Sequence, residues 1–281
     1  MRKKIIINAD DLGLSRSVNE AIFEVYKAGN LTSATLMVDM PGTEHAALGA
    51  AGHPSLSLGL HFCITEGKAL VGTSSITDAH GHFLERSVLI RKAIRGELFV
   101  DHIRREFLAQ LGRMADLGVS PSHVDSHQHV HMLPVVFEAM APVLAERELP
   151  VRCVDPPIRT VVGSLSRPKK ALKQWMNKRF AARLRSVHPG RTNDVLVSIH
   201  DLDQVGPYDA HIYRMLIGMA PPGKVVELMV HPYRNGKDVL DLYSAQLGKK
   251  KPFLERCFAE YNALVSGTLF PDEELINYRN I

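Results

Sequence analysis

Residues 4–11 read Lys4-Ile5-Ile6-Ile7-Asn8-Ala9-Asp10-Asp11, an apolar run that ends directly on two carboxylates. A branched apolar run without alternation is typical of a strand that is covered on both faces of a parallel sheet. Neighbouring side chains of an extended chain point to opposite sides, so Asp10 and Asp11 can take different roles, one as a metal ligand and the other as a general base. The alternative is a solvated strand end, or an N-cap for the helix that follows.

Similar apolar runs recur along the chain and alternate with helical patterns, which indicates parallel βα units. We expect seven strands, over residues 4–9, 34–39, 56–62, 123–127, 151–155, 194–200 and 225–231. Apolar residues at helical spacing lie between them, for example over 103–114 and 254–265. Ser17 and Glu20 have the spacing of a capping box, which predicts that the first helix begins after Ser17.

Titratable side chains gather at one end of these predicted strands. They are Asp10, Asp11, His61, His127, Asp155, His200 and His231. In a parallel α/β barrel the C-terminal ends of the strands carry the active site, because the βα loops converge there. The 281 residues contain no linker-like stretch. We therefore predict one domain over residues 1–281, an α/β barrel with its active site at the C-terminal ends of the strands.

The stretch Asp125-Ser126-His127-Gln128-His129-Val130-His131 carries three histidines at a spacing of two. On an extended segment these side chains share one face, so two or three imidazoles can converge, and Asp125 can orient one of them. This clustering predicts metal or catalytic use, with a structural polar network as the alternative. His61 lies inside an apolar run, where a ligand and a hydrogen-bonded core histidine are both open interpretations.

Two histidines end the last two apolar runs, His200 before Asp201 and His231 before Pro232. Either can serve as a general acid, and the sequence does not choose between them. A histidine at a strand end that is open to solvent is the alternative.

Composition narrows the class of protein. Hydrophobic residues make up 45% of the chain, enough for a sizeable core, and no apolar run approaches the roughly 18 residues of a membrane span. The basic start of the chain is followed by an apolar stretch of only residues 5–7, too short for a signal peptide, so a cytoplasmic location is expected. Three widely spaced cysteines predict neither a disulfide framework nor a cysteine-type zinc site.

The formal charge of +4 comes largely from residues 167–185 and 249–251. No nucleic-acid motif accompanies them, so no nucleic-acid partner is predicted. Residues 167–185 form a basic amphipathic pattern with Leu172, Trp175, Met176, Phe180 and Leu184 on one side. We interpret it as an outer helix with a solvated cationic face; contact with a membrane surface or a lipid-bearing substrate is the alternative, which an exposed apolar face would favour.

Together these motifs resemble the YdjC-like carbohydrate deacetylase family, which includes chitooligosaccharide deacetylases and hopanoid-biosynthesis-associated members. The resemblance rests on residues 7–15, 29–38, 59–62, 125–131, Arg152 and 227–232. It departs at Leu12, where the family usually has Phe, and at Tyr233, where a small residue is common. We expect neither to touch the metal ligands that the resemblance implies, but Tyr233 can reshape the pocket. The resemblance implies a distorted seven-stranded (β/α) barrel and the removal of an N-acetyl group from an N-acetylhexosamine unit of an oligosaccharide or glycolipid.

The resemblance also implies roles for residues. Asp11, His61 and His127 would hold one divalent metal ion, which the ligand types leave open among zinc, cobalt, manganese, nickel and magnesium. Asp10 would be the base and His231 the acid. Arg152 would bind substrate. A metal-dependent phosphoesterase and a non-catalytic sugar- or lipid-binding protein remain the rival functions, and the oligomeric state stays open.

Overall fold

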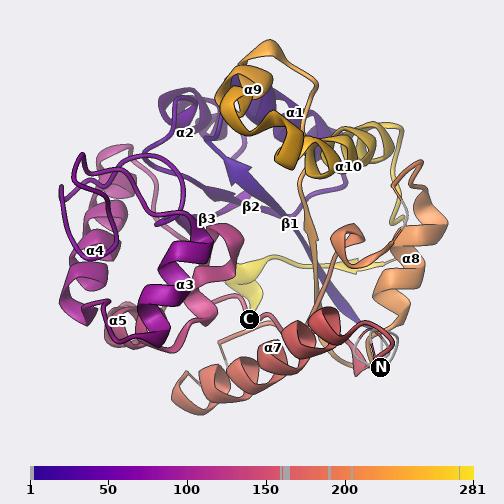
Figure 1. Ribbon diagram of the computed structural model, residues 1–281. Coiled ribbons are helices and arrows are strands. Elements are labelled where there is room, and N and C mark those ends of the chain that lie inside the picture. The colour runs from indigo at the N-terminus through magenta and orange to yellow at the C-terminus, as the bar shows by residue number, and fades with distance from the viewer. Residues whose placement is uncertain (1–2, 159, 161–164, 189–190, 204, 272) are drawn as a thin grey trace.

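The computed structural model describes residues 3–158, 160, 165–188, 191–203, 205–271 and 273–281. Its centre is a curled parallel sheet, a half-barrel with helices around its outside (Figure 1). The strands follow the order β4 (Val124–Ser126), β3 (Ser57–Phe62), β2 (Ser33–Leu36), β1 (Lys4–Leu12), β6 (Val225–Val230) and β5 (Val195–Val197). The short β7 (Glu274–Leu275) pairs with the beginning of β1. The predicted α/β fold with parallel strands is therefore confirmed.

The predicted strand over 151–155 is wrong in this form. Val151 makes a single bridge to Val124, and the segment then hydrogen-bonds toward β5 through the Asp155 carbonyl oxygen. Prolines stand on both sides of it, at Pro150 and at 156–157, and a proline has no N–H to extend a ladder. The segment thus lies between β4 and β5 without forming a strand, so the described strands form a curled half-barrel, with which a distorted barrel is compatible.

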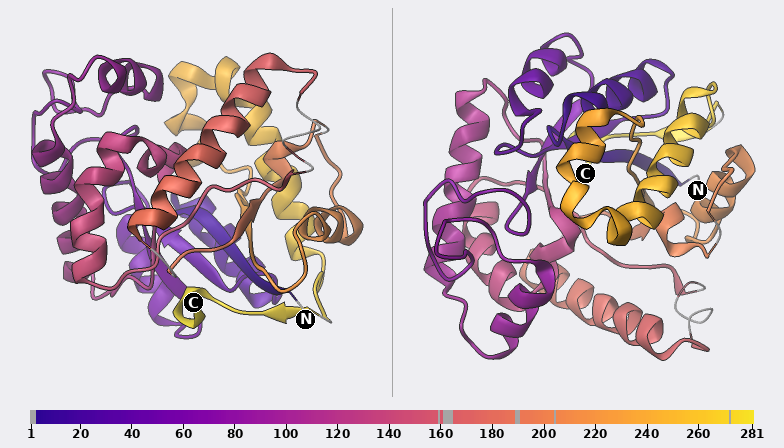
Figure 2. Two further views of the ribbon diagram at one scale, coloured as in Figure 1. Left: turned by 90° about the horizontal axis from the view of Figure 1, so that it is seen from below. Right: turned by 45° about the horizontal axis from the view of Figure 1, so that its top comes forward.

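Helices cover the outer side of the sheet in each view (Figure 2). They are α1 (Arg16–Lys27), α2 (Thr43–Ala51), α3 (Arg86–Ile94), α4 (Val100–Asp116), α5 (Pro134–Glu146), α7 (Pro168–Val187), α8 (Ala210–Gly218), α9 (Lys237–Leu242) and α10 (Leu247–Val265). The helical stripes predicted over 103–114 and 254–265 lie within α4 and α10 and are confirmed. No helix in the described part of the chain is long and apolar enough to cross a membrane.

The capping box predicted at the start of α1 is wrong by two residues. Ser15 is the N-cap, and its hydroxyl oxygen accepts a hydrogen bond from the Val18 N–H at 3.3 Å. Ser17 lies inside the first turn and donates to the Asp238 carboxylate at 2.5 Å. The Ser17 side chain, which the spacing predicted to cap the helix, therefore bonds to α9 instead.

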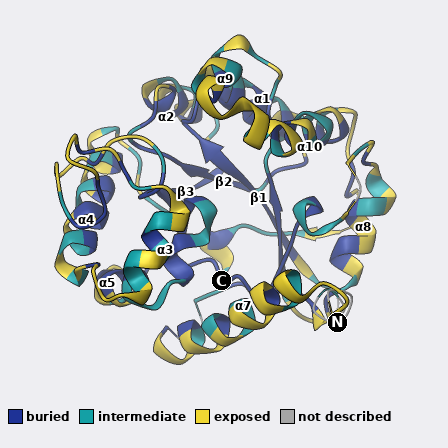
Figure 3. Ribbon diagram, in the orientation of Figure 1, coloured by how far each residue is buried: buried dark blue, intermediate teal, exposed yellow. Residues whose placement is uncertain are grey.

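Burial separates the interior of the structure, where the strands lie, from the outer faces of the helices (Figure 3). Every residue of β1 from Ile5 onward is buried, as expected for a strand covered on both faces. Exposed residues lie mainly on the outward faces of the helices. Polar residues at the end of β1 are therefore held in a rigid, desolvated frame.

Candidate metal centre and active site

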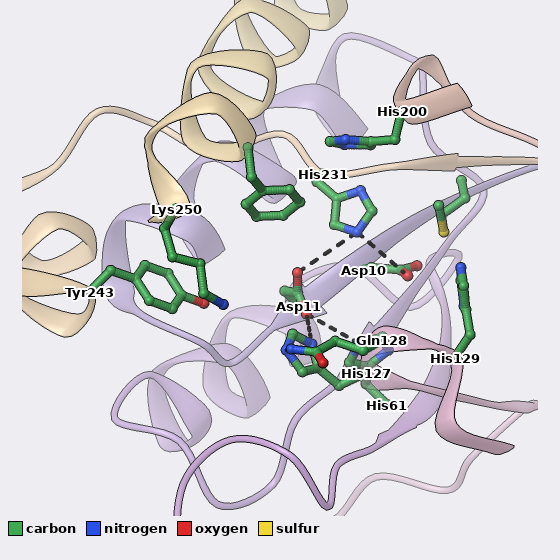
Figure 4. A pocket seen from close by; sticks show the side chains of 12 residues that line it. Asp10, Asp11, His61, His127, Gln128, His129, His200, His231, Tyr243 and Lys250 are labelled. Carbon is green, nitrogen blue, oxygen red and sulfur yellow. Dashed lines mark hydrogen bonds and ion pairs between the residues drawn. The ribbon is translucent and has the colours of Figure 1, made fainter. Parts of the chain in front are cut away.

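Three side chains from separate parts of the chain meet at one oxygen atom. The Asp11 Oδ1 atom lies 3.1 Å from His61 Nε2 and 3.0 Å from His127 Nδ1. Asp11 belongs to β1, His61 to β3, and His127 follows β4, so all three stand at the C-terminal ends of adjacent or nearby strands (Figure 4). All three are buried, and their ligand atoms lie within 4.8 Å of one another.

Left-handed backbone conformations at two places bring Asp11 and the two histidines together. Asp11 has φ +65°, an uncommon value for a residue other than glycine. Gln128 and His129 have φ +54° and +57°. The extended histidine segment that the spacing predicted is therefore wrong beyond His127, because the chain turns there into a 3₁₀ segment, His127–Met132.

That turn separates the three histidines. His131 is fully buried away from the cavity, where its Nε2 donates to the Arg152 carbonyl oxygen at 3.0 Å. Burial lowers the pKa of His131 to about 3, so it is a neutral structural group. His129 lines another part of the cavity wall. Only His127 of the three joins Asp11.

The electrostatic environment around Asp11, His61 and His127 favours a bound cation. Burial alone would lower the pKa of His61, but Asp125 and Asp11 outweigh it and raise that pKa well above its usual value. Burial likewise opposes ionisation of Asp11, yet the charge and hydrogen bonds of the two imidazoles hold its pKa well below the usual range. A buried position that favours imidazolium over imidazole is one that favours positive charge.

Asp125 fixes the orientation of His61. Its Oδ1 atom is 2.7 Å from His61 Nδ1, which leaves Nε2 directed at Asp11. This carboxylate–histidine pairing is the usual support of a metal-bound imidazole. Two imidazoles and one carboxylate, so supported, fit a divalent ion such as zinc, cobalt, manganese or nickel, or magnesium if water completes its shell.

Asp10 lines the same cavity as Asp11 and is held by Arg152. The extended chain predicted opposite sides for the two carboxylates; this is wrong, because the positive φ of Asp11 breaks the alternation. Two guanidinium nitrogens of Arg152 lie 2.6 and 2.7 Å from the two carboxylate oxygens of Asp10. Burial opposes ionisation of Asp10, but the Arg152 charge outweighs it and lowers the pKa of Asp10 well below the usual range. Arg152 also bonds Asp125 at 2.7 Å and Glu227 at 2.8 Å, and it is fully buried.

A cavity of about 270 Å³ opens over these groups. It is lined by Asp10, Asp11, His61, His127, Gln128, His129, His200, Met229, His231, Tyr243, Lys250 and Phe253. His231 faces the carboxylate pair: its Nε2 lies 3.8 Å from Asp10 Oδ2 and 3.9 Å from Asp11 Oδ2 (Figure 4). The ring of His200 is 4.8 Å from that of His231, centre to centre, and lies beyond it as seen from the carboxylates (Figure 4). Arg152 does not line the cavity.

Sequence reasoning missed two contacts of this site. The Tyr233 hydroxyl donates to Asp11 Oδ2 at 2.5 Å, so the expectation that Tyr233 does not touch the proposed ligands is wrong. The Glu260 carboxylate accepts from the His231 backbone N–H at 2.7 Å. Glu260 belongs to α10, and burial raises its pKa to about 8. Its place in a helical pattern gave no signal of this contact.

The fold and the site define a class: an α/β protein with a candidate metal centre at the carboxyl edge of a parallel sheet. The YdjC-like protein family matches residues 4–269, and the chain belongs to this family.

Two related proteins match part of its sequence. A carbohydrate deacetylase of Geobacillus stearothermophilus is 42% identical over 160 residues, 57% of this chain and 62% of that protein. A chitooligosaccharide deacetylase of Serratia marcescens is 40% identical over 153 residues, 54% of this chain and 60% of that protein. The chain thus matches about three fifths of the length of these relatives.

A solved structure supports the fold alone. A protein of Enterococcus faecalis V583 named for cellobiose-phosphate cleavage superposes with a TM-score of 0.73 at 22% identity. The match covers 100% of this chain and 99% of the other.

Proposed function

We propose that this protein is a metal-dependent hydrolase that removes the N-acetyl group from an N-acetylhexosamine unit of an oligosaccharide or glycolipid. The observation that carries the proposal is the meeting of His61 and His127 at one oxygen of Asp11, with Asp10 and His231 on the same cavity. The names of the related carbohydrate deacetylases support the sugar substrate.

In this proposal Asp11, His61 and His127 would hold the ion. The chemistry that such an ion supplies is Lewis acidity, which acidifies water and polarises a carbonyl group. Asp10 accepts a proton from the attacking water at one of its carboxylate oxygens. Since Arg152 keeps the pKa of Asp10 low, Asp10 holds that proton only briefly.

His231 then protonates the departing amine. Its Nε2 atom lies 3.8 Å from Asp10 Oδ2, close enough for a proton taken by Asp10 to reach the imidazole over a short path. His200 lies beyond His231 as seen from both carboxylates (Figure 4), which favours His231 as the acid. Arg152 was predicted to bind substrate; its buried contacts with three carboxylates lead us to propose that it positions Asp10 instead.

Acetate release tests this function. Metal-stripped protein receives zinc, cobalt or magnesium and is assayed on N-acetylglucosamine oligosaccharides and glycolipids, with bound metal counted in parallel. We expect metal-dependent acetate release that His127→Ala abolishes together with metal binding. Asp10→Asn should retain the metal and lose about 10²- to 10⁴-fold in rate. His80→Ala, in an exposed loop, is the control. Full activity of Asp10→Asn would exclude Asp10 as the base.

A metal-dependent phosphoesterase is the second candidate. It is favoured by another group of possible ligands, His200, His231 and Glu260, whose donor atoms lie within 4.8 Å of one another. It predicts two or more ions per chain and turnover of a phosphoester without acetate release. Stoichiometric metal without turnover of either substrate would indicate the third alternative, a binding protein.

A further inference from the structure

Helix α7 is strongly cationic. It carries four lysines and three arginines and has no acidic residue. The inner side of the helix uses part of this charge to hold the helix on the body of the protein. Lys178 and Arg185 pair with Asp155, and Lys170 lies 3.6 Å from Asp203. Only Gln174, Ala181 and Leu184 of this helix are buried.

The outward side of α7 combines apolar and cationic residues. Leu172, Trp175 and Met176 are 57%, 53% and 38% exposed. Their spacing of three and four places them on one stripe. We call this stripe and its cations the α7 outer face: Lys169, Leu172, Lys173, Trp175, Met176, Arg179 and Arg183.

The helix is an outer one with a solvated cationic face, as predicted. The sequence left the burial of its apolar side open, and of the five apolar residues predicted to share a side only Leu184 is buried, which favours the alternative of lipid contact. The cations of the α7 outer face make no ion pair with any described residue; Arg179 instead lies 5.0 Å over the Trp175 ring. Apolar side chains and unpaired cations are thus presented together.

We propose that the α7 outer face docks peripherally on an anionic lipid bilayer. Aliphatic and indole side chains at the centre can enter the headgroup region, while the surrounding lysines and arginines contact lipid phosphates. A second copy of the chain is a poor partner for this face, because pairing the face with itself brings cations against cations. Nucleic acid would use the cations but would leave the aliphatic side chains without a partner.

Helix α7 borders the candidate active site. Lys173 of the α7 outer face, with Gln174 and Asn177 of the same helix, lines a cavity of about 100 Å³. This cavity and the active-site cavity share three lining residues, His129, His200 and Met229. Docking through α7 would therefore bring the active site next to the lipid surface. If the proposed function holds, this favours a glycolipid over a free oligosaccharide as the substrate; the docking itself does not depend on that function.

Trp175 is the only tryptophan of the chain, so its fluorescence reports on this face alone. The unmodified protein is titrated with phosphatidylcholine vesicles, with and without a quarter of phosphatidylglycerol. We expect a blue shift and quenching by brominated lipid with the anionic vesicles only, both weakening as salt is raised.

Paired variants locate the contact. Lys169→Glu/Arg183→Glu should weaken vesicle binding at least tenfold, whereas Lys249→Glu/Lys251→Glu, an equal change of charge on another helix, should not. Leu172→Ser should weaken it, whereas Leu48→Ser, at a site that is 79% exposed on α2, should not. Co-sedimentation with vesicles measures the binding of all four variants.

Three outcomes would overturn the proposal: no shift with anionic vesicles, equal loss in the α7 and control variants, or a blue shift that depends on protein concentration without lipid. The last would assign the face to a second copy. Acetate release from a soluble oligosaccharide, measured on the same variants, separates failure of docking from failure of the proposed function.

Discussion

At the scale of single residues, Asp39 is a carboxylate whose ionised form is disfavoured in the folded protein. It follows β2, and neither carboxylate oxygen has a hydrogen bond to another of the described residues. Burial, and then the nearby charge of Glu106, raise the pKa of Asp39 to about 7. In the unfolded chain the value is near 3.8, so the folded state binds this proton more tightly. Folding stability from this group is therefore lost as pH rises from about 4 to 7, and it stays lost above that.

Asp39→Asn should accordingly stabilise the protein more at pH 8 than at pH 5. The gain at pH 8 is expected to be on the order of a few kcal/mol, or several degrees in melting temperature. Thermal unfolding at the two pH values measures it. Asp241→Asn, at an exposed position on α9, controls for the loss of one negative charge. A gain of equal size at both pH values would contradict a raised pKa of Asp39.

Individual site residues could be predicted where each ends a strand. Asp10, Asp11 and His61 follow this rule, because apolar runs locate the strand ends and parallel strands bring those ends together. Tyr233 and Glu260 could not be predicted, since each reaches the site through packing between segments far apart in the sequence.

At the scale of elements, the turn between β1 and α1 fixes where the carboxylate pair stands. Gly13 has φ +94°, and a Cβ atom there would lie 2.5 Å from the Met37 carbonyl oxygen. Its N–H donates to Asn19 Oδ1 at 2.6 Å. The turn therefore needs glycine both for its backbone conformation and for close approach to the chain after β2.

Gly13→Ala should lower stability by about 1–3 kcal/mol and also weaken metal binding, because the clash sits two residues from Asp11. Gly112→Ala is the matched control: it lies inside α4 with open space around its Cα, so alanine should stabilise the helix by roughly 0.5–1 kcal/mol. The measurements are the melting temperature and the metal affinity of the two variants. Similar effects from both would show that the turn does not require glycine.

Elements were predictable where one pattern ran over many residues, as in α4, α10 and β1. The errors fall on short segments. At 151–155 the flanking prolines remove ladder donors, and after His127 left-handed residues end the alternation on which the three-histidine face relied. Positive φ is uncommon for any residue other than glycine, so the spacing of Gln128 and His129 could not predict this turn.

At the scale of the whole molecule, Arg152 ties the sheet together from inside. Its guanidinium contacts Asp10 of β1, Asp125 of β4 and Glu227 of β6, and all four groups are buried. A single cation thus contacts carboxylates from three strands that are far apart in the sequence. The Tyr278 hydroxyl closes the network on Glu227 near the C-terminal end.

Removing this cation should destabilise the fold in a pH-dependent way. In Arg152→Met three buried carboxylates lose the cation that they share, which costs about 3–5 kcal/mol, a fall on the order of 10 °C in melting temperature. Burial already raises the pKa of Glu227, and the Arg152 charge opposes that rise; Arg152 also holds the pKa of Asp10 down. Without Arg152 both pKa values rise, and protonation at low pH relieves the repulsion. The loss should therefore be smaller at pH 5 than at pH 8.

Two further variants make this prediction decisive. Adding Glu227→Gln to Arg152→Met should recover part of the loss at pH 8, because it removes one unpaired charge. Arg113→Met, which breaks an exposed pair with Glu44, should cost no more than about 1 kcal/mol. If Arg152→Met melted within 2 °C of the unaltered protein at pH 8, Arg152 would not be what holds the three strands. The low pKa of Asp10, on which its proposed role as a briefly protonated base depends, would then need another cause.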